Sequence, residues 1–433
     1  MSLIHTWSSL RPSERRVLLA RPSQNVAKET GAAVRRILEQ VRADGDHALR
    51  LLTRRFDGCE LDGLWIGAEE LAQASASLDP ALKTAISESI ARIESFHRAQ
   101  RPAELSLETA PGLRCERIIR PIRRVGLYVP AGSAPLPSTL LMLAVPAKLA
   151  GCREIIVCTP PRGDGRIDPT VAAAAHMLGL ERVARVGGAQ AIAAMAYGTE
   201  SIPRCDKIFG PGNAYVTEAK RQVAAEPDGP DIDLPAGPSE VLVIADESAR
   251  ADWVAADLLA QAEHGPDAQA IAVSPARRLL EAVADAIKAQ RARLPRSDIL
   301  AQSLAHLRLI EVEDLAQAFA LSNEHAPEHL ILHLRHPRRW LDRVEAAGSV
   351  FLGPYTPETL GDYTSGTNHV LPTGGAARAR SGVSLESFLL RITVQEASRE
   401  GLLAVAQAAM RLAEAEGLAA HRAAVALRLE EGA

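Results

Sequence analysis

The alternation of short apolar strands with helices between residues 137 and 225 most constrains the fold of this chain. Strands are expected at 155–159, 183–186 and 207–209, and helices at 138–150, 169–178, 189–197 and 213–225. Strands and helices that alternate at this spacing are typical of parallel sheets with right-handed crossovers. A second series of shorter units follows between residues 241 and 352. The sequence therefore predicts an α/β protein with parallel sheets.

The two ends of the chain follow a different pattern. Apolar residues repeat at helical spacing at Val34, Ile37, Leu38 and Val41, so the first 110 residues are expected to be mainly helical. From Thr393 onward the sequence is rich in alanine and is also expected to be almost wholly helical. This tail is too narrow to form a core of its own, so we expect its apolar face to pack against another surface.

Charge and composition exclude several classes of partner. The net charge of −4 provides no basic field that could hold nucleic acid or anionic lipid. The longest apolar run, at 140–150, is interrupted by Pro146 and Lys148 and is too short to span a membrane. No signal peptide is visible, and the five cysteines include no CxxC pair, which fits free thiols in a reducing compartment. A cytoplasmic enzyme without nucleic-acid or membrane partners is expected.

A candidate metal-binding turn lies at the end of one predicted helix. Asp257, Gln261 and His264 lie on one helical face, and Gly265 with Pro266 ends the helix. The carboxyl end of a helix carries partial negative charge and favours a cation. From spacing alone, a polar turn exposed to water is the more common explanation.

A candidate proton-transfer pair, Glu328 and His329, leads directly into the apolar strand predicted at 330–334. Glutamate and histidine are the side chains best suited to moving protons near neutral pH. A solvated loop remains the alternative, because His325, His333 and His336 crowd the same region.

Two further polar segments have less specific patterns. Residues 361–369 contain Asp362 and His369 among glycines and short polar residues, which predicts a loop of the kind that often carries functional groups. His421 is a lone histidine in the tail, and such residues usually lie at the surface.

Two glycine-rich turns, at 186–190 and 209–213, each follow a predicted strand and open a predicted helix. Backbone N–H groups at such helix starts can hold phosphates. No GxGxxG fingerprint occurs in this α/β stretch, so a standard dinucleotide-binding motif is not supported.

Taken together, the segments resemble the histidinol dehydrogenase family, which performs the last two oxidations of histidine biosynthesis. The resemblance covers essentially the whole chain, and its motifs occur in this order: YVPAGSAP (128–135), GGAQAIAA (187–194), FGPGNAYV (209–216), DLPAGPSE (233–240), QAEH (261–264), APEHL (326–330) and GDYTSGTNHVLPT (361–373).

The resemblance implies roles for individual residues. One zinc ion per subunit would be bound by Gln261, His264, Asp362 and His421. Glu328 and His329 would be the catalytic residues, and NAD would contact Tyr128, Gln190 and Asn213. The substrate would contact Ser239, Gln261, His264, His329, Asp362, Glu416 and His421.

The resemblance also implies a fold of two Rossmann-like parallel-sheet domains without the usual GxGxxG. The first would comprise residues 25–127 and 241–383, with the zinc and catalytic residues, and the second residues 128–240, with the NAD contacts. Residues 1–24 would form an N-terminal helical segment. Residues 384–433 would form a helical tail that is exchanged between the subunits of a homodimer.

The implied reaction is the NAD-dependent four-electron oxidation of L-histidinol to L-histidine through L-histidinaldehyde, with two NAD⁺ consumed per substrate. His329 is expected to act as the base, Glu328 to activate water, and zinc to orient the substrate. One alternative is a related zinc and NAD alcohol dehydrogenase for a different small polar alcohol, and another is a non-catalytic metal-binding scaffold. A cysteine-dependent aldehyde dehydrogenase is the third, although Cys152, Cys158 and Cys205 have the pattern of buried structural thiols.

Overall fold

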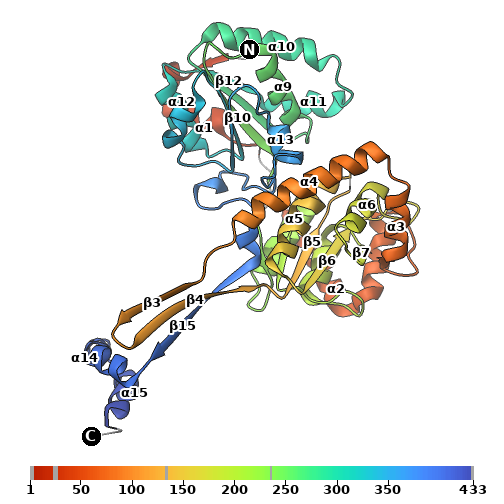
Figure 1. Cartoon of the computed structure of the whole chain (residues 1–433). Helices are drawn as coiled ribbons and strands as arrows, with labels where there is room; N and C mark the ends of the chain where they lie inside the picture. Colours follow the sequence, from red (N-terminus) through yellow and green to blue (C-terminus); the bar gives the residue numbers. More distant parts are fainter. Residues whose placement is uncertain (1–3, 23–27, 132–134, 235–236, 431–433) are drawn as a thin grey trace.

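The computed structural model describes residues 4–22, 28–131, 135–234 and 237–430. These residues form two α/β domains and a long arm that projects from one of them (Figure 1). Residues 132–134 and 235–236 of two motifs named above lie outside the described residues, as do residues 1–3 and 23–24 of the N-terminal segment. Within the described part of the chain, no helix combines the length and apolar character needed to cross a membrane.

The central domain, which we define as residues 28–99 and 122–234, contains a six-stranded sheet in the order β2-β7-β6-β5-β8-β9. All of its strand pairs are parallel except β2 with β7. Its strands are β2 (Trp65–Gly67), β5 (Arg124–Tyr128), β6 (Glu154–Thr159), β7 (Arg182–Arg185), β8 (Lys207–Phe209) and β9 (Asp231–Ile232). The order reverses between β5 and β8, because the chain continues from β5 to β6 and β7 and then returns to β8 on the opposite side.

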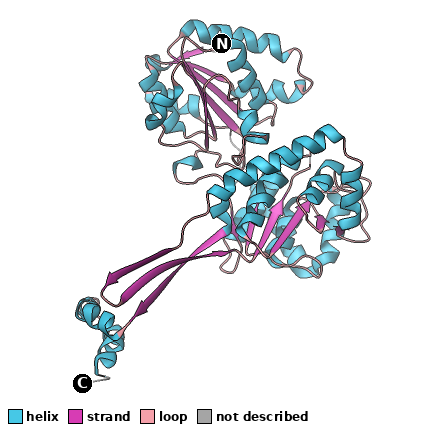
Figure 2. Ribbon diagram, viewed as in Figure 1, coloured by secondary structure: helices cyan, strands magenta, loops and turns pink. Residues whose placement is uncertain are grey.

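Helices cover both faces of the central sheet (Figure 2). One face packs against α3 (Ala68–Ala76), α4 (Pro80–Ala99), α5 (Pro137–Ala150) and α6 (Pro169–Met177). The other packs against α2 (Lys28–Phe56), α7 (Gly188–Tyr197) and α8 (Ala214–Ala224). Because both faces of the sheet are buried, the sequences of its strands are short, almost continuous apolar runs.

The second α/β domain consists of residues 4–22 and 237–363. We call it the split domain, because the whole central domain lies between these two stretches of sequence. Its sheet has the order β1-β12-β11-β10-β13-β14, and every strand pair is parallel. The strands are β1 (Ile4–Thr6), β10 (Glu240–Ala245), β11 (Gln269–Ser274), β12 (Arg308–Glu311), β13 (His329–His333) and β14 (Ser349–Leu352). Strands β10 to β14 repeat the order of β5 to β9, so the two domains have the same Rossmann-like topology.

The helices of the split domain also lie on both faces of its sheet. One face packs against α9 (Ala251–Ala262), α10 (Arg277–Arg291) and α11 (Ser297–Ser303). The other packs against α1 (Pro12–Leu19), α12 (Leu315–His325) and the 3₁₀ helix Pro337–Arg343. A short helix, α13 (Glu358–Tyr363), follows β14.

The domain boundaries differ from those expected. Residues 25–127 were expected to belong with residues 241–383, but α2, α3 and α4 pack on the central sheet, and β2 pairs with β7. The N-terminal segment, expected to be helical, begins with β1, which joins the split sheet beside β12. Hydrophobic periodicity shows that a helix has an apolar face, but it does not show which sheet that face covers.

The arm is a three-stranded antiparallel sheet with two helices at its far end (Figure 1). Its elements are β3 (Leu105–Ala110), β4 (Leu113–Pro121), β15 (Leu389–Ala397), α14 (Arg399–Ala415) and α15 (Ala419–Glu430). The expectations of a helical N-terminal stretch and a helical tail were therefore wrong at β3 and β15. Strand β15 forms because it pairs along its whole length with β4, more than 260 residues earlier in the chain.

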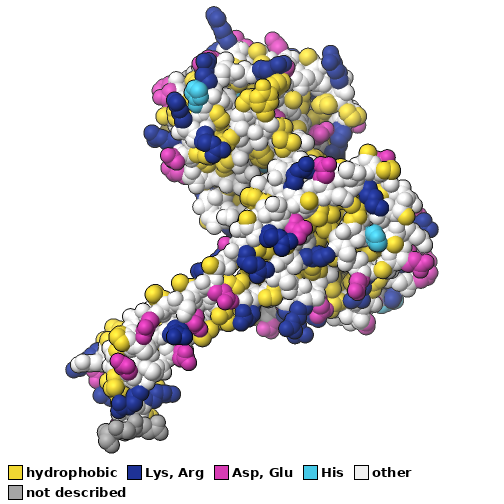
Figure 3. Space-filling view, in the orientation of Figure 1, with side chains coloured by type: hydrophobic (Ala, Val, Ile, Leu, Met, Phe, Trp, Pro, Cys, Tyr) yellow, Lys and Arg dark blue, Asp and Glu magenta, His cyan; other side chains and the backbone are white. Residues whose placement is uncertain are grey.

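Apolar side chains lie along the surface of the arm (Figure 3). Large hydrophobic residues that remain exposed include Leu105, Leu107, Leu390, Ile392, Leu403, Leu412, Leu418 and Leu427. Exposed apolar patches of this extent are typical of surfaces that bind another protein chain.

Candidate active site

The predicted proton-transfer pair lies at the amino-terminal edge of the split sheet. Strand β13 begins at His329, beside the start of β10, where Val241 pairs with His329. Glu328 and His329 are only 6% and 5% exposed, which excludes the solvated loop considered above. Both residues therefore sit in a buried position that the β-sheet register determines.

The backbone of Glu240 contacts both members of the pair. Its N–H donates a hydrogen bond to Oε2 of Glu328 at 2.9 Å, and its carbonyl oxygen lies 3.2 Å from Nδ1 of His329. Because a carbonyl oxygen only accepts hydrogen bonds, Nδ1 of His329 carries the proton. Nε2 of His329 is then left as the proton-accepting atom.

Burial changes the proton affinity of both groups. It raises the pKa of Glu328 well above the usual glutamate value, so the Glu328 carboxylate is a stronger base than an exposed one. Burial lowers the pKa of His329 to about 3, so the imidazole is neutral near pH 7. Near pH 7, Nε2 of His329 therefore carries no proton, and Glu328 is a second buried group of the site that can exchange one.

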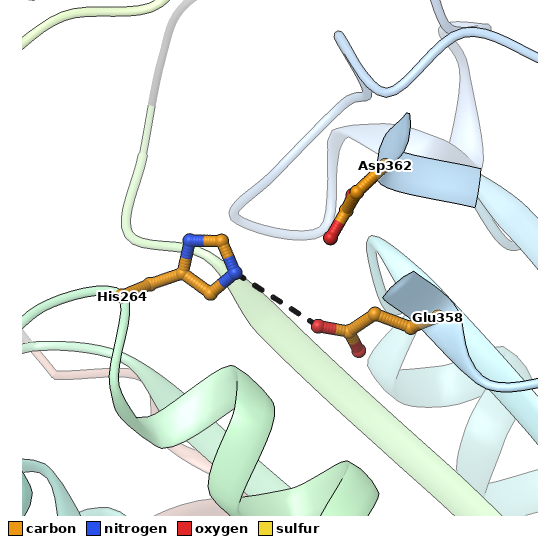
Figure 4. Close-up of side chains that lie close together, drawn as sticks. All are labelled: His264, Glu358 and Asp362. Atoms are coloured by element: carbon orange, nitrogen blue, oxygen red, sulfur yellow. Dashed lines mark ion pairs between the residues drawn. The ribbon is translucent and has the colours of Figure 1, made fainter. Parts of the chain in front are cut away.

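Three side chains that could hold a metal ion lie close together (Figure 4). Ligand atoms of His264, Glu358 and Asp362 all lie within 4.8 Å of one another. His264 follows α9, whereas Glu358 and Asp362 lie one turn apart on α13. Asp362 Oδ1 is 3.9 Å from Nε2 of His329, so the cluster and the proton-transfer pair are neighbours.

Buried polar atoms without partners support a cation at this cluster. Gln261 is fully buried on the last turn of α9, and neither of its amide atoms has a hydrogen-bond partner among the described residues. The same is true of both carboxylate oxygens of Glu358, which is 1% exposed. Unsatisfied buried groups are costly. The amide, imidazole and carboxylate donors present here are ligands that a divalent ion such as zinc accepts.

Burial also raises the pKa values of the two carboxyl groups on α13. The pKa of Asp362 rises to about 6, and that of Glu358 rises well above its usual range. Glu358 is further affected by repulsion from Asp362, Glu328 and Asp257. A bound cation would offset both burial and repulsion.

Glu358 is a site residue that the sequence analysis missed. Residues 361–369 were expected to form a loop, but residues 358–363 form α13. The available signal was Pro357 followed by Glu358 and Asp362 at i and i+4, a spacing that places both carboxylates on one helical face. The glycines that follow made this segment resemble a loop.

The other buried histidines near the pair each lie beside a carboxylate. Nε2 of His333 contacts Asp257 Oδ2 at 2.8 Å, so Asp257 is paired with His333 outside the cluster. His325 lies 3.5 Å from Oε2 of Glu240. Ser239, predicted as a substrate contact, lies immediately before β10 at the same sheet edge as Glu328.

The two tail residues predicted to join the site are not brought to it within this chain. Glu416 ends α14 and His421 lies on α15, and both are exposed at the far end of the arm (Figure 1). Of the four predicted metal ligands, only Gln261, His264 and Asp362 therefore lie on the split domain of this chain.

The three predicted NAD contacts lie at the carboxyl edge of the central sheet. Tyr128 ends β5, Gln190 lies in the first turn of α7, and Asn213 caps α8. Tyr128 and Asn213 follow the neighbouring strands β5 and β8, between which the strand order reverses. Crevices at such reversals are the usual ligand-binding positions of α/β sheets.

Side-chain oxygen atoms of Tyr128 and Asn213 already accept hydrogen bonds from backbone N–H groups of the protein. The buried hydroxyl of Tyr128 accepts a hydrogen bond from Gly188 N at 3.0 Å. Asn213 Oδ1 accepts hydrogen bonds from the N–H groups of Tyr215 and Val216. Gly210 has a φ of 120°, and a Cβ there would lie 2.1 Å from the carbonyl oxygen of Tyr128. This glycine therefore permits a close approach between the turn and β5.

The two functional edges lie near each other. Strand β9 ends at Ile232 and β10 begins at Glu240, and the eight Cα steps between them span at most roughly 29 Å. His369 links the domains, because its Nε2 lies 3.4 Å from Thr139 Oγ1 and its Nδ1 bonds the carbonyl oxygen of Asp362 at 2.9 Å. The carboxyl edge of the central sheet therefore lies close to the edge of the split sheet that carries Glu328 and His329.

All five cysteines are free, and three of them were considered as nucleophiles. Burial raises the pKa of Cys152 and Cys158 to about 12 and that of Cys205 well above the usual value. Reactive cysteines have lowered pKa values. These thiols therefore have the properties of structural residues.

Comparison with known proteins gives a consistent result. The family model described as histidinol dehydrogenase matches residues 19–429. A histidinol dehydrogenase of Xanthomonas euvesicatoria is 59% identical over 423 residues, and one of Vibrio vulnificus is 49% identical over 425; each alignment covers 98% of both chains. The crystal structure of histidinol dehydrogenase from Elizabethkingia anophelis matches with a TM-score of 0.94 at 43% identity, over 99% of this chain and 97% of that one.

Proposed function

The chain belongs to the histidinol dehydrogenase family, and we propose that it oxidises L-histidinol to L-histidine through L-histidinaldehyde, with two NAD⁺ reduced per substrate. The observation that carries the proposal is the 59% identity to a histidinol dehydrogenase over 98% of both chains. A different small polar alcohol is not favoured as the substrate, because the match extends over nearly the whole of each relative. The free thiols fit a cytoplasmic enzyme.

We propose that one zinc ion per subunit binds at the cluster described above. Gln261, His264 and Asp362 would hold it from this chain, and His421 of the partner subunit would complete the set. The unpartnered amide of Gln261 and the close approach of His264 to Asp362 support this assignment. Zinc would supply a fixed point that orients the amine and imidazole of the substrate.

Two residues would move the protons. His329, with its proton on Nδ1 directed to Glu240, presents Nε2 to accept the hydroxyl proton of the alcohol and later that of the hydrated aldehyde. Glu328 would activate the water that adds to the aldehyde, and its burial makes the carboxylate a stronger base. The 3.9 Å between His329 Nε2 and Asp362 Oδ1 supports a base that lies next to the groups that would hold the substrate.

Tyr128, Gln190 and Asn213 would line the NAD site at the carboxyl edge of the central sheet. NAD⁺, when bound, accepts the hydride in each oxidation. Tyr128 would act chiefly by holding the turn at Gly188, because its hydroxyl is buried and already bonded there. Ser239, Gln261, His264, His329 and Asp362 would contact the substrate from the split domain.

A homodimer with exchanged arms would complete the site. The exposed apolar residues of the arm need a partner, and α15 has no buried residue in the single chain. We propose that α14 and α15 bind a second copy, so that Glu416 and His421 of the partner subunit contact the substrate and the metal.

The reaction stoichiometry tests the function directly. Two NADH should form for each L-histidinol consumed, and the activity should disappear after metal stripping and return on addition of zinc. Formation of one NADH per substrate would contradict the four-electron oxidation, and full activity in a metal-free preparation would contradict the metal site.

A further inference from the structure

Glu240 lies at the centre of the proposed catalytic pair although it has no assigned role. Its N–H bonds Oε2 of Glu328 at 2.9 Å, and its carbonyl oxygen accepts from Nδ1 of His329 at 3.2 Å. Any displacement of this one peptide segment would therefore move both proton-transfer groups together.

The side chain of Glu240 is anchored by the N-terminal segment. Its carboxylate is 2% exposed and forms a two-point contact with Arg21, at 2.5 Å from Nε to Oε2 and 3.0 Å from Nη2 to Oε1. Such forked arginine–carboxylate pairs are strong and fix orientation. Although burial opposes ionisation, the nearby His325 and the hydrogen-bonded Arg21 hold the pKa of Glu240 below its usual value.

Arg21 also contacts the turn that leads into the catalytic pair. Its Nη2 donates to the carbonyl oxygen of His325 at 2.7 Å and lies 3.4 Å from that of Ala326. Ala326 has a φ of 53°, in the left-handed region that L-residues with a Cβ rarely adopt. This strained position comes two residues before Glu328, and Arg21 joins it to the start of β10.

The segment that carries Arg21 is itself attached to the split domain. Strand β1 pairs with β12, and Nε2 of Gln269 donates to the carbonyl oxygen of Ala20 at 3.1 Å. Arg21 is therefore held from both sides, by its own segment and by Glu240.

We propose that Arg21 is a positioning residue, which acts through Glu240 and the His325–Ala326 turn to hold Glu328 and His329 in their reactive geometry. The inference rests on the proposed function, because it takes Glu328 and His329 as the proton-transfer pair. In the described part of the chain, Arg21 bonds Glu240 and the His325–Ala326 turn and not Gln261, His264 or Asp362, so its loss should affect turnover while metal and substrate binding are retained.

Steady-state kinetics of the full-length, zinc-loaded protein test this. Arg21→Met removes the charge and the fork but keeps most of the side-chain length. We expect kcat to fall about 10- to 100-fold, as for small displacements of catalytic groups. The KM for L-histidinol and the zinc content should stay within about twofold, since the metal cluster is untouched. Arg21→Lys should recover part of kcat, because it restores the charge without the fork.

A control variant and a double variant complete the experiment. Arg16→Met is the matched control, since Arg16 is exposed on α1 of the same segment, and it should behave as the wild type. Glu240→Gln combined with Arg21→Met should cost little more than Arg21→Met alone, because both changes break the same contact.

Failure of the Arg21 proposal can be distinguished from failure of the proposed function. A folded Arg21→Met with kcat within twofold of the wild type would overturn the proposal, as would equal losses of kcat, metal content and substrate affinity. If Arg21→Met does not fold, Arg21→Lys decides, because an unchanged kcat contradicts the role and a lowered kcat at unchanged KM supports it. Failure of the wild-type protein to form NADH from L-histidinol would instead reject the proposed function and, with it, the premise.

Discussion

At the scale of single residues, the buried cluster of His264, Glu358 and Asp362 shows how the properties of a carboxylate depend on burial. Glu358 lies 4.0 Å from His264, and both of its oxygens are buried without partners among the described residues. A carboxylate in this position is stable only beside positive charge or when protonated. Its contribution to the site should therefore appear in metal affinity.

We predict that Glu358→Gln weakens zinc binding about 10- to 100-fold, the usual effect of removing a supporting carboxylate at a metal site. Competition with a chromogenic chelator would measure the affinity without recourse to activity. Glu313→Gln is the control, because Glu313 is an exposed carboxylate of the same domain. An unchanged zinc affinity in Glu358→Gln would place Glu358 outside the metal site.

The proton-transfer pair allows a second prediction. His329→Asn should slow both oxidations by about 10²–10⁴, because it removes the accepting atom Nε2 in each step. Glu328→Gln should slow mainly the second oxidation, which alone needs an activated water. Single turnovers started from the alcohol or from the aldehyde would separate the steps. Equal losses for Glu328→Gln on the two substrates would refute this division of roles.

At the scale of elements, the turn between β8 and α8 is held by a buried ion pair. Lys220 on α8 pairs with Asp233, and both side chains are 1% exposed. Lys220 also donates to the carbonyl oxygen of Gly210 at 2.8 Å, and Asp233 accepts from Gly210 N at 2.7 Å. The turn that ends in Asn213 is thus attached to both α8 and the segment after β9.

We predict that Lys220→Met lowers the free energy of unfolding by about 3–5 kcal/mol, because it leaves the buried charge of Asp233 without a partner. The double variant with Asp233→Asn should recover much of this loss. Urea denaturation measures both, and Lys288→Met, which breaks the exposed pair with Asp285, should have little effect. Equal effects of the buried and exposed changes would show that the pair does not hold the turn.

At the scale of the whole molecule, the arm separates the proposed site into two parts. His264 and Asp362 lie on the split domain, whereas His421 lies at the end of the arm beyond the central domain (Figure 1). A complete site would then require two chains, each supplying its arm to the other.

Mixing two inactive variants tests this arrangement. Gln261→Ala is defective in the body and His421→Ala in the tail. After the two are unfolded together and refolded, each mixed dimer would have one site with both defects and one with neither. Random pairing makes about half of the dimers mixed, so activity should return to roughly a quarter of the wild-type value. Continued inactivity, with mixed dimers verified by native mass spectrometry, would contradict a shared site.

The sequence by itself indicated the α/β class, several strands of the two sheets and most of the candidate site. The strand predicted at 207–209 matches β8 at both ends, and those predicted at 155–159 and 183–186 lie within one residue of β6 and β7, because apolar periodicity reports local burial. Gln261, His264, Asp362, Glu328 and His329 were identified by motif resemblance, since the spacing of each motif alone had a more ordinary explanation.

Tertiary structure alone decided the features that depend on contacts between distant residues. These are the packing of α2 to α4 on the central sheet, the pairing of β15 with β4, and the positions of Glu358 and of Glu240 with Arg21. Arg21 and Glu240 are 219 residues apart, and no local pattern distinguishes either of them from an ordinary surface charge. The two residues meet only because β1, β10 and β13 join one sheet. Glu240 is buried there, so its charge needs the opposite charge of Arg21 as a partner.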